Sequence, residues 1–341
     1  MIWLVWRRQR AALLTAAALV AVFAVVLVVG RVEFVAQLRA HGIDDACAHL
    51  LSEACRTAAS AAFNGDPLVG FGPFWGLSHS ALLVVPLVVG LLAGAGLFGR
   101  ELDDGTHVLA LTQSVTVTRW WATGLLTAGA PVAALLALLG LVAEWAYTPY
   151  ALITSPFSPL ETPLFEVSGV VPVACGLLGF ALAAGTGLVA RGRLAPAVVA
   201  VAGYGVVMFV LATTARPQYL PAEIVRQTVD YSRPDLGISE IADAWTVERR
   251  WVDADGGYIS GCGGYSCLQE AGVTTYEVRT QPDSRYWPFQ LIETALLMTL
   301  SGVALALTHP RLVVRVKDRM PALSWRRGRP RVAGAAAGSR G

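Results

Sequence analysis

Residues 11–29 read Ala-Ala-Leu-Leu-Thr-Ala-Ala-Ala-Leu-Val-Ala-Val-Phe-Ala-Val-Val-Leu-Val-Val, a run without a charged side chain. A helix needs about 20 apolar residues to cross the hydrocarbon core of a bilayer, so this run is long enough to span it. Five further runs of similar length and apolar character follow: 74–98, 120–145, 167–190, 194–212 and 288–307. None alternates with a period of two, which favours helices over the strands of a membrane barrel.

The composition of the chain leads to the same interpretation. Hydrophobic residues make up 55% and charged residues 15% of the 341 residues, and the mean hydropathy is +0.56. These values are too apolar for a soluble domain of this length. The first run is longer than the core of a secretory signal, and residues 30–33 supply no small-residue cleavage site. We therefore predict an all-α polytopic membrane protein with six transmembrane helices.

Arginine residues indicate the orientation, because short loops rich in Arg and Lys stay on the cytoplasmic side of a membrane. Arginines precede the first run, flank the connection 99–119 and crowd the C-terminal tail, whereas residues 147–166 include no basic residue. This pattern predicts that both termini are cytoplasmic. The connection 215–287 has seven arginines but is expected outside, since long loops translocate largely regardless of charge.

A domain organisation follows from these assignments. We predict an interfacial amphipathic start (1–10), a membrane domain with helices one to five (11–214), an external loop (31–73), a larger external insertion (215–287), a sixth helix (288–310) and a basic cytosolic tail (311–341). The tail is expected to be disordered and attracted to anionic lipid rather than to nucleic acid. The bias towards Arg, Ala and Val suggests a high-GC bacterium and hence its plasma membrane.

The predicted external segments include four of the five cysteines. Thiols oxidise outside the cytoplasm, so we expect Cys262 to bond Cys267, and Cys47 with Cys55 is the less certain pair. The spacings match no common zinc pattern, and no metal site is predicted. Cys175 lies within a predicted span and is expected to behave as a small apolar residue.

The larger insertion has local signals of its own. Residues 221–230 favour a helix. Residues 251–254 and 258–260 flank Asp255-Gly256-Gly257, which predicts a β-hairpin. The fold class therefore includes a small disulfide-containing external insertion between the fifth and sixth helices.

Enzyme motifs are missing from the sequence. An ATP-hydrolysing domain needs a Gly-rich phosphate loop that ends in Gly-Lys-Ser or Gly-Lys-Thr, and the only lysine is Lys317, in Val-Lys-Asp. The zinc-protease motif His-Glu-x-x-His is also absent. An intramembrane serine protease with Ser301 and His79 is a weak alternative, because no glycine stands two residues before the serine. We predict neither catalysis nor a cofactor in this chain.

The connection 99–119 has three acids, Glu101, Asp103 and Asp104, in a short cytosolic loop where basic residues are the rule. Gly105-Thr106 then ends one helix and caps the next. Apolar residues at positions i, i+3 and i+7 beyond this break predict a short amphipathic helix at the membrane surface.

These residues resemble the cytosolic loop between the second and third spans of type-2 ABC exporter permeases. The matching letters are Arg100-Glu101, Gly105-Thr106, Leu109, Leu111 and Thr118-Arg119-Trp120. The six spans, the cytoplasmic termini and the polar external segment before the last span are also similar to that family. The chain departs from the pattern at Ser114-Val115, where many relatives have a proline, and in its larger external insertions.

The resemblance implies a permease subunit of an exporter. In such permeases two six-span subunits, identical or paired homologues, face one another in the lipid bilayer, and separate ABC ATPase subunits bind ATP and Mg and grip the loop. The coupling residues would be Arg100, Glu101, Asp103, Asp104, Gly105, Thr106, His107 and Arg119. The alternative is a solvated loop with acids at a helix end.

Three ionisable residues inside spans are candidates for a substrate path: His79, Glu144 and Glu293. Each lies within about two turns of the predicted outer surface, so snorkelling to the lipid headgroups is an equal alternative. As path residues they would favour a cationic or amphiphilic cargo. An ATPase-independent secondary transporter is the alternative function, although we find neither internal repeats nor mid-membrane charges to favour it.

Overall fold

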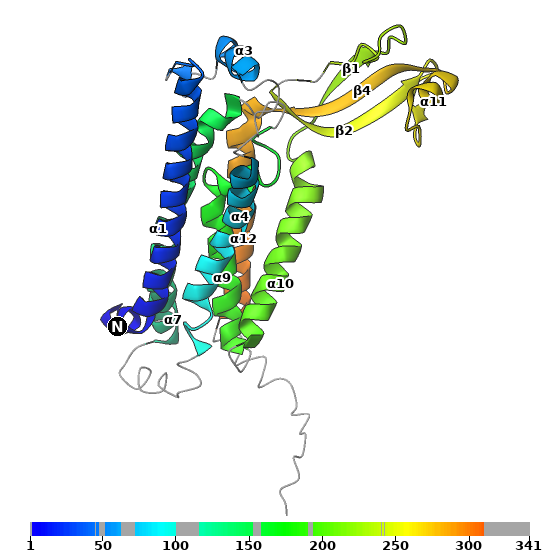
Figure 1. The fold of residues 1–341 in the computed structure, drawn as a ribbon. Helices are drawn as coiled ribbons and strands as arrows, with labels where there is room; N and C mark the ends of the chain where they lie inside the picture. The colour runs from blue at the N-terminus through cyan, green and yellow to red at the C-terminus, as the bar shows by residue number, and fades with distance from the viewer. Residues whose placement is uncertain are drawn as a thin grey trace, which may run out of the picture.

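A computed structural model describes residues 2–44, 46–47, 52–62, 72–99, 116–152, 158–189, 194–239, 241 and 243–309. Within them, six helices are long and apolar enough to cross a membrane, which confirms the predicted number of spans. The helices that carry these spans are α1 (Ile2–Ala40), α4 (Gly72–Gly94), α7 (Val117–Tyr147), α9 (Val171–Val189), α10 (Leu194–Val210) and α12 (Tyr286–Leu307). They stand side by side as one upright bundle (Figure 1).

Helix α9 occupies the centre of this bundle and packs against α4, α7, α10 and α12. Its span is 72% buried, against at most 44% for any other. Glycines allow the close approach of α4: a Cβ atom added to Gly90 would lie 2.3 Å from the carbonyl oxygen of Gly176 on α9. One at Gly94 would lie 2.6 Å from the carbonyl oxygen of Phe180. Small residues thus bring two membrane helices into backbone contact.

A four-stranded antiparallel sheet corrects the all-α prediction. Its strands are β1 (Glu223–Thr228), β2 (Ala244–Asp253), β3 (Tyr258–Ile259) and β4 (Val273–Pro282), in the order β1-β4-β2-β3. The predicted hairpin is confirmed, since Trp251 pairs with Ile259 and Val252 with Tyr258.

The helix predicted over 221–230 is wrong, because β1 occupies most of that segment. Each residue of β1 has a partner on β4, from Glu223 opposite Thr280 to Thr228 opposite Thr275. The alternating burial of the second half of β1 is typical of a strand with one covered face. A partner about 50 positions away overrides a weak local preference.

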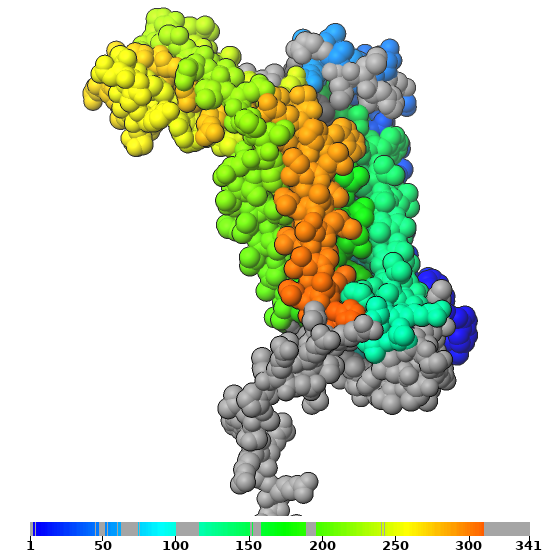
Figure 2. Space-filling view, turned by 180° about the vertical axis from the view of Figure 1, so that it is seen from behind, coloured from blue at the N-terminus to red at the C-terminus, as the bar shows by residue number. Residues whose placement is uncertain are grey.

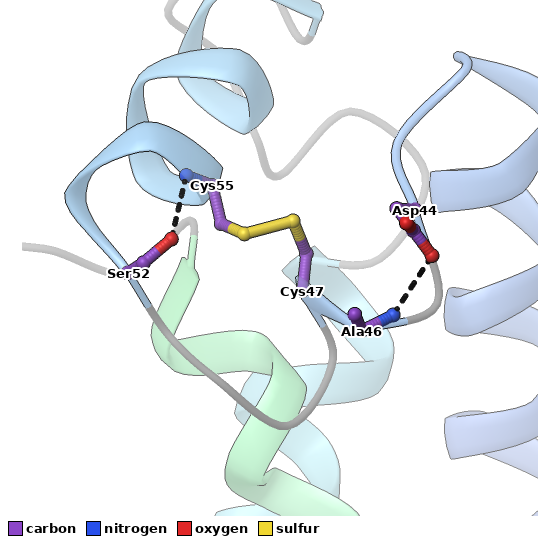
Figure 3. The surroundings of a disulfide bond; sticks show 5 residues. All are labelled: Asp44, Ala46, Cys47, Ser52 and Cys55. Carbon is purple, nitrogen blue, oxygen red and sulfur yellow. Dashed lines mark hydrogen bonds between the residues drawn. A yellow bond between two sulfur atoms is a disulfide. The ribbon is translucent and has the colours of Figure 1, made fainter.

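Both predicted disulfides are present. The bond between Cys262 and Cys267 closes a short loop that leads into the first turn of helix α11 (Tyr265–Glu270). Cys47 and Cys55, with Cα atoms 5.4 Å apart, join the segment after α1 to helix α3 (Glu53–Ala62), where the Ser52 hydroxyl accepts a hydrogen bond from the Cys55 amide (Figure 3). Cys175 is buried as a free thiol, as expected.

The bundle has two different ends. The sheet and α3 lie at one, called here the sheet end, and the sheet projects sideways beyond α10 (Figures 1 and 2). At the opposite end α1 begins, α4 ends, α7 begins and α12 ends (Figure 1). Residues 2–10 are the first turns of α1 itself, and exposed Trp3 and Trp6 lie among them.

Candidate functional site

The last turns of α10 change their winding before the chain enters the sheet. Leu211–Ala215 form a π-helical turn, and Arg216–Gln218 form a 3₁₀ turn that leads towards β1. A π-turn widens the helix and shifts the residues that follow around its axis, and such turns are frequent at functional sites. Arg216 is 0% exposed at this point, whereas Thr213 and Thr214 before it are exposed.

Arg216 is the centre of a buried polar cluster. Its guanidinium donates to both carboxylate oxygens of Glu293 on α12, with distances of 2.9 Å from Nε and 2.8 Å from Nη2. Nη2 also donates to Oε1 of Glu166 at 2.7 Å, and Nη1 donates to the Thr162 hydroxyl at 3.0 Å. The guanidinium lies over the Phe165 ring, 4.2 Å from its centroid. This fork geometry is what arginine offers and lysine does not.

Two carboxylates share the single guanidinium. Glu293 is 0% exposed and also accepts a hydrogen bond from the Tyr219 hydroxyl at 3.1 Å. Burial and the nearby Glu293 carboxylate raise the pKa of Tyr219 well above its ordinary value, so this hydroxyl remains a donor. Glu166, on helix α8 (Leu164–Val167), is 3% exposed, and its Oε1 also accepts from Thr162. We call Thr162, Glu166, Arg216, Tyr219 and Glu293 the Arg216 cluster.

One atom of this cluster is unsatisfied. Oε2 of Glu166 is buried and has no hydrogen-bond partner among the described residues. Buried carboxylate oxygens in proteins are nearly always paired, because an unpaired charge in an apolar interior is unfavourable. The cluster therefore satisfies the Glu166 carboxylate only in part, although the unpaired oxygen is closed off from solvent.

A cavity of about 690 Å³ adjoins Glu166. Its walls come from α4, α10, the π-turn, the segment before α8 and β2, and include Leu87, Met208, Phe209 and Trp245. Glu161 adds a second acid, and burial raises the pKa of its carboxyl group. Among the described lining residues none is Arg or Lys. The site is thus an open, mostly apolar cavity with acidic residues in its lining.

A second polar network joins α12 to α7 and α9. The Gln290 amide oxygen accepts from the amides of Val170 and Val171, both at 3.0 Å, and so caps the start of α9. The Tyr286 hydroxyl donates to Glu144 at 3.0 Å and shares a hydrogen bond with Ser168.

The sheet is bonded to the same helices. The Gln281 amide of β4 donates to the carbonyls of Pro217 and Leu220, and Arg285 donates to the Pro221 carbonyl. Since β1 follows the 3₁₀ turn after α10 and β4 leads into α12, strands and helices form one bonded unit at the sheet end.

The three predicted path residues have different surroundings. Glu293 belongs to the Arg216 cluster, so its carboxylate is bound to Arg216 and does not snorkel to the headgroups. Glu144 contacts α12 through Tyr286, and His79 on α4 stacks on Tyr147, with the ring centroids 4.1 Å apart. The structure does not bring the three into one site.

Glu166 and Arg216 were missed by the sequence analysis. One feature of the sequence could have indicated the cluster: Glu166, Arg216 and Glu293 each lie near one end of an apolar run. Because successive spans run in opposite directions, these three ends lie on the same side of the bundle. Opposite charges at span ends on one side of a membrane are candidates for pairing.

The predicted coupling residues lie mostly outside the described part of the chain. Arg100, Glu101, Asp103, Asp104, Gly105, Thr106 and His107 belong to the segment that the structure leaves undescribed. Arg119 is exposed in the first turn of α7, where its amide donates to the Thr116 hydroxyl at 3.3 Å and completes an N-cap.

A comparison with models of protein families identifies the family of the helical bundle. Residues 17–216 match the family model described as ABC-2 membrane transporter related, a match that begins within α1 and ends at Arg216. Searches of curated proteins and of solved structures returned no match. Because the family model covers more than half of the chain, this multi-pass membrane protein belongs to the ABC-2 membrane transporter related family.

Proposed function

We propose that this chain is the membrane-spanning permease subunit of an ABC exporter, which forms the substrate path and is driven by separate ABC ATPase subunits. The observation that carries the proposal is the family match, which coincides with the first five spanning helices. A second copy or a homologue would complete the path, and the partner ATPase would bind ATP and Mg.

Two independent features favour an orientation with the opposite end in the cytoplasm of a bacterial cell. Exposed arginines gather there, in the first turns of α1 and at Arg119. Both disulfides lie at the sheet end, and disulfides persist in oxidising compartments. With this orientation the ends of α4 and α7 that flank residues 100–115 face the ATPase.

The orientation is tested with a membrane-impermeant maleimide on intact cells. Glu270→Cys, at the end of α11 on the sheet end, should react with the maleimide. Thr118→Cys, in the first turn of α7, should react only after the cells are broken. The reverse pattern would place the ATPase contact on the wrong side and refute the proposal.

Coupling is tested by co-purification with the ATPase encoded beside this chain and by its rate of ATP hydrolysis. We expect Glu101→Ala and Gly105→Val to insert normally but to retain less ATPase. Asp235→Ala and Gly302→Val are matched controls, because Asp235 is an exposed acid at the sheet end and an added Cβ at Gly302 meets no atom within 4 Å. Unchanged recovery of ATPase by both test variants would contradict the coupling role.

A secondary transporter is the second candidate, because the Arg216 cluster buries ionisable groups of the kind that ion-coupled carriers use. Vesicles that hold only this chain distinguish the two. Uphill transport of solute driven by a proton gradient without ATPase or ATP would establish the carrier. Transport that needs both ATPase and ATP would establish the permease.

A further inference from the structure

We propose that the cavity beside Glu166 is a binding site for an organic monocation with an apolar body. Binding itself stands independently of the ATPase. That such cations are the cargo rests on the proposed function.

The first reason is the charge balance. Glu166 and Glu293 bring two carboxylates to one guanidinium, and Arg216 already occupies both oxygens of Glu293. The remaining acceptor is the orphan oxygen of Glu166, a residue that is 3% exposed and lines the cavity. The oxygen itself is closed off from the cavity, so a cation bound there would not touch it but would balance the excess negative charge of the cluster through an apolar environment.

The second reason is the character of the walls. The lining includes Leu83 and Leu87 of α4, Met208 and Phe209 of α10, and Trp245 of β2. Aromatic faces attract cations, and a Met side chain adapts to ligands of different shape. A volume of about 690 Å³ lies within the range of small-molecule sites.

The same observations argue against other ligands. An anion would meet Glu161 and Glu166 with no cationic side chain among the described lining residues. A neutral apolar molecule would leave the excess negative charge of the cluster unbalanced. A lone water molecule would leave the apolar walls without a ligand, and it predicts no preference for cations.

The experiment uses the purified full-length chain in nanodiscs without ATPase. The probe is tetraphenylphosphonium, and its control is tetraphenylborate, which has nearly the same shape and the opposite charge. Affinity is measured by equilibrium binding of each labelled ion, with empty nanodiscs subtracted. We expect saturable binding of the cation at one site per chain and at least tenfold weaker binding of the anion.

Two variants locate the site. Glu166→Gln keeps the shape of the side chain but removes its charge, and we expect at least tenfold weaker cation binding. Gly205→Phe fills the cavity from α10 without a backbone clash, because a Cβ at Gly205 meets no atom within 4 Å. Gly302→Phe, at an equally open position on α12, is the matched control and should bind like the wild type.

The possible results distinguish failure of the binding site from failure of the permease function. Equal binding of both ions, or cation binding that survives Gly205→Phe, would overturn the proposal even if ATPase coupling is later demonstrated. If the wild-type chain binds the cation but neither retains an ATPase nor needs one for transport, the permease function is refuted and the binding site is not. The bound cation could be the ammonium group of a lipid or a free amphiphile, and the lipid composition of the discs distinguishes the two. If phosphatidylethanolamine added to phosphatidylglycerol discs weakens binding of the probe, its ammonium headgroup occupies the site. If the probe binds equally well in both kinds of disc, the occupant is a free amphiphile.

Discussion

The Arg216 cluster and the contact between α4 and α9 hold the same bundle together by different means. The cluster joins α10, α12 and the segment before α9 through ion pairs and hydrogen bonds with fixed directions. The α4–α9 contact depends on glycines that let two backbones touch. Directional bonds fix both distance and angle, whereas van der Waals packing fixes distance and allows sliding along the contact.

The directional bonds tie some parts of the molecule to one another and leave α4 outside that unit. The sheet, α10 and α12 form a unit tied by Arg216, Gln281 and Arg285. Helix α4 contacts this unit mainly through α9 and borders the cavity on its other side. A shift of α4 along α9 would therefore change the cavity without breaking the cluster. In the proposed orientation α4 would end beside the ATPase, and this would give ATP-driven movement a route to the cavity.

The largest expected effect comes from removing the shared cation. Arg216→Leu leaves two buried carboxylates without their partner, and such a loss costs about 3–5 kcal/mol of stability. We expect a large fall in the thermal unfolding midpoint in detergent. The control is Arg233→Leu, because Arg233 and its partner Asp235 are 60% and 52% exposed and the loss of such a surface pair should matter little.

A triple variant checks the cause. Arg216→Leu combined with Glu166→Gln and Glu293→Gln removes the unpaired charges and should recover part of the lost stability. If the unfolding midpoint of the triple variant is no higher than that of Arg216→Leu alone, the loss of stability comes from packing of the arginine side chain and not from its charge.

The second prediction concerns the glycine contact. In Gly90→Ala the new methyl group would lie 2.3 Å from the Gly176 carbonyl oxygen and 2.7 Å from the Phe180 amide nitrogen, so α4 must move away from α9. Overpacking of this kind costs about 1–3 kcal/mol. Thermal unfolding should show a clear decrease for Gly90→Ala. Gly76→Ala on the same helix should show none, because its methyl group meets no atom within 4 Å. Equal midpoints for the two variants would contradict the contact.

The two regions also differ in how far sequence predicts them. Apolar runs predicted the six spans, since length and hydropathy are local properties. The turn at Asp255-Gly256-Gly257 predicted the β2–β3 hairpin, and the location of four cysteines in predicted external segments predicted both disulfides. The strand β1 was predicted as a helix because its partner β4 lies far along the chain.

The Arg216 cluster was inaccessible for a related reason. Glu166 and Glu293 come from separate segments, and only the fold brings them within 3 Å of one guanidinium. Glu293 lies inside a predicted span and was a candidate from sequence for that reason, whereas Glu166 and Arg216 lie in the predicted loops next to the spans. Charged residues just beyond the ends of spans are therefore candidates for buried ion pairs in the same way as charged residues inside spans.

The smallest expected effect tests whether ion pairs matter when they are exposed. Hydrogen bonds from Arg250 and then Arg279 on the sheet surface lower the pKa of Glu248 below its ordinary value of 4.5. A carboxylate with a lowered pKa in the folded state stabilises that state at neutral pH, and the contribution disappears as the pH falls below 4.5 through the folded pKa. We therefore expect Glu248→Gln to unfold at a slightly lower temperature than the wild type at pH 7, and we expect this difference to shrink as the pH falls below 4.5. A difference that does not shrink as the carboxyl group is protonated would assign the effect to side-chain packing. A loss at pH 7 as large as that of Arg216→Leu would show that burial is not what separates the cluster from the surface pairs.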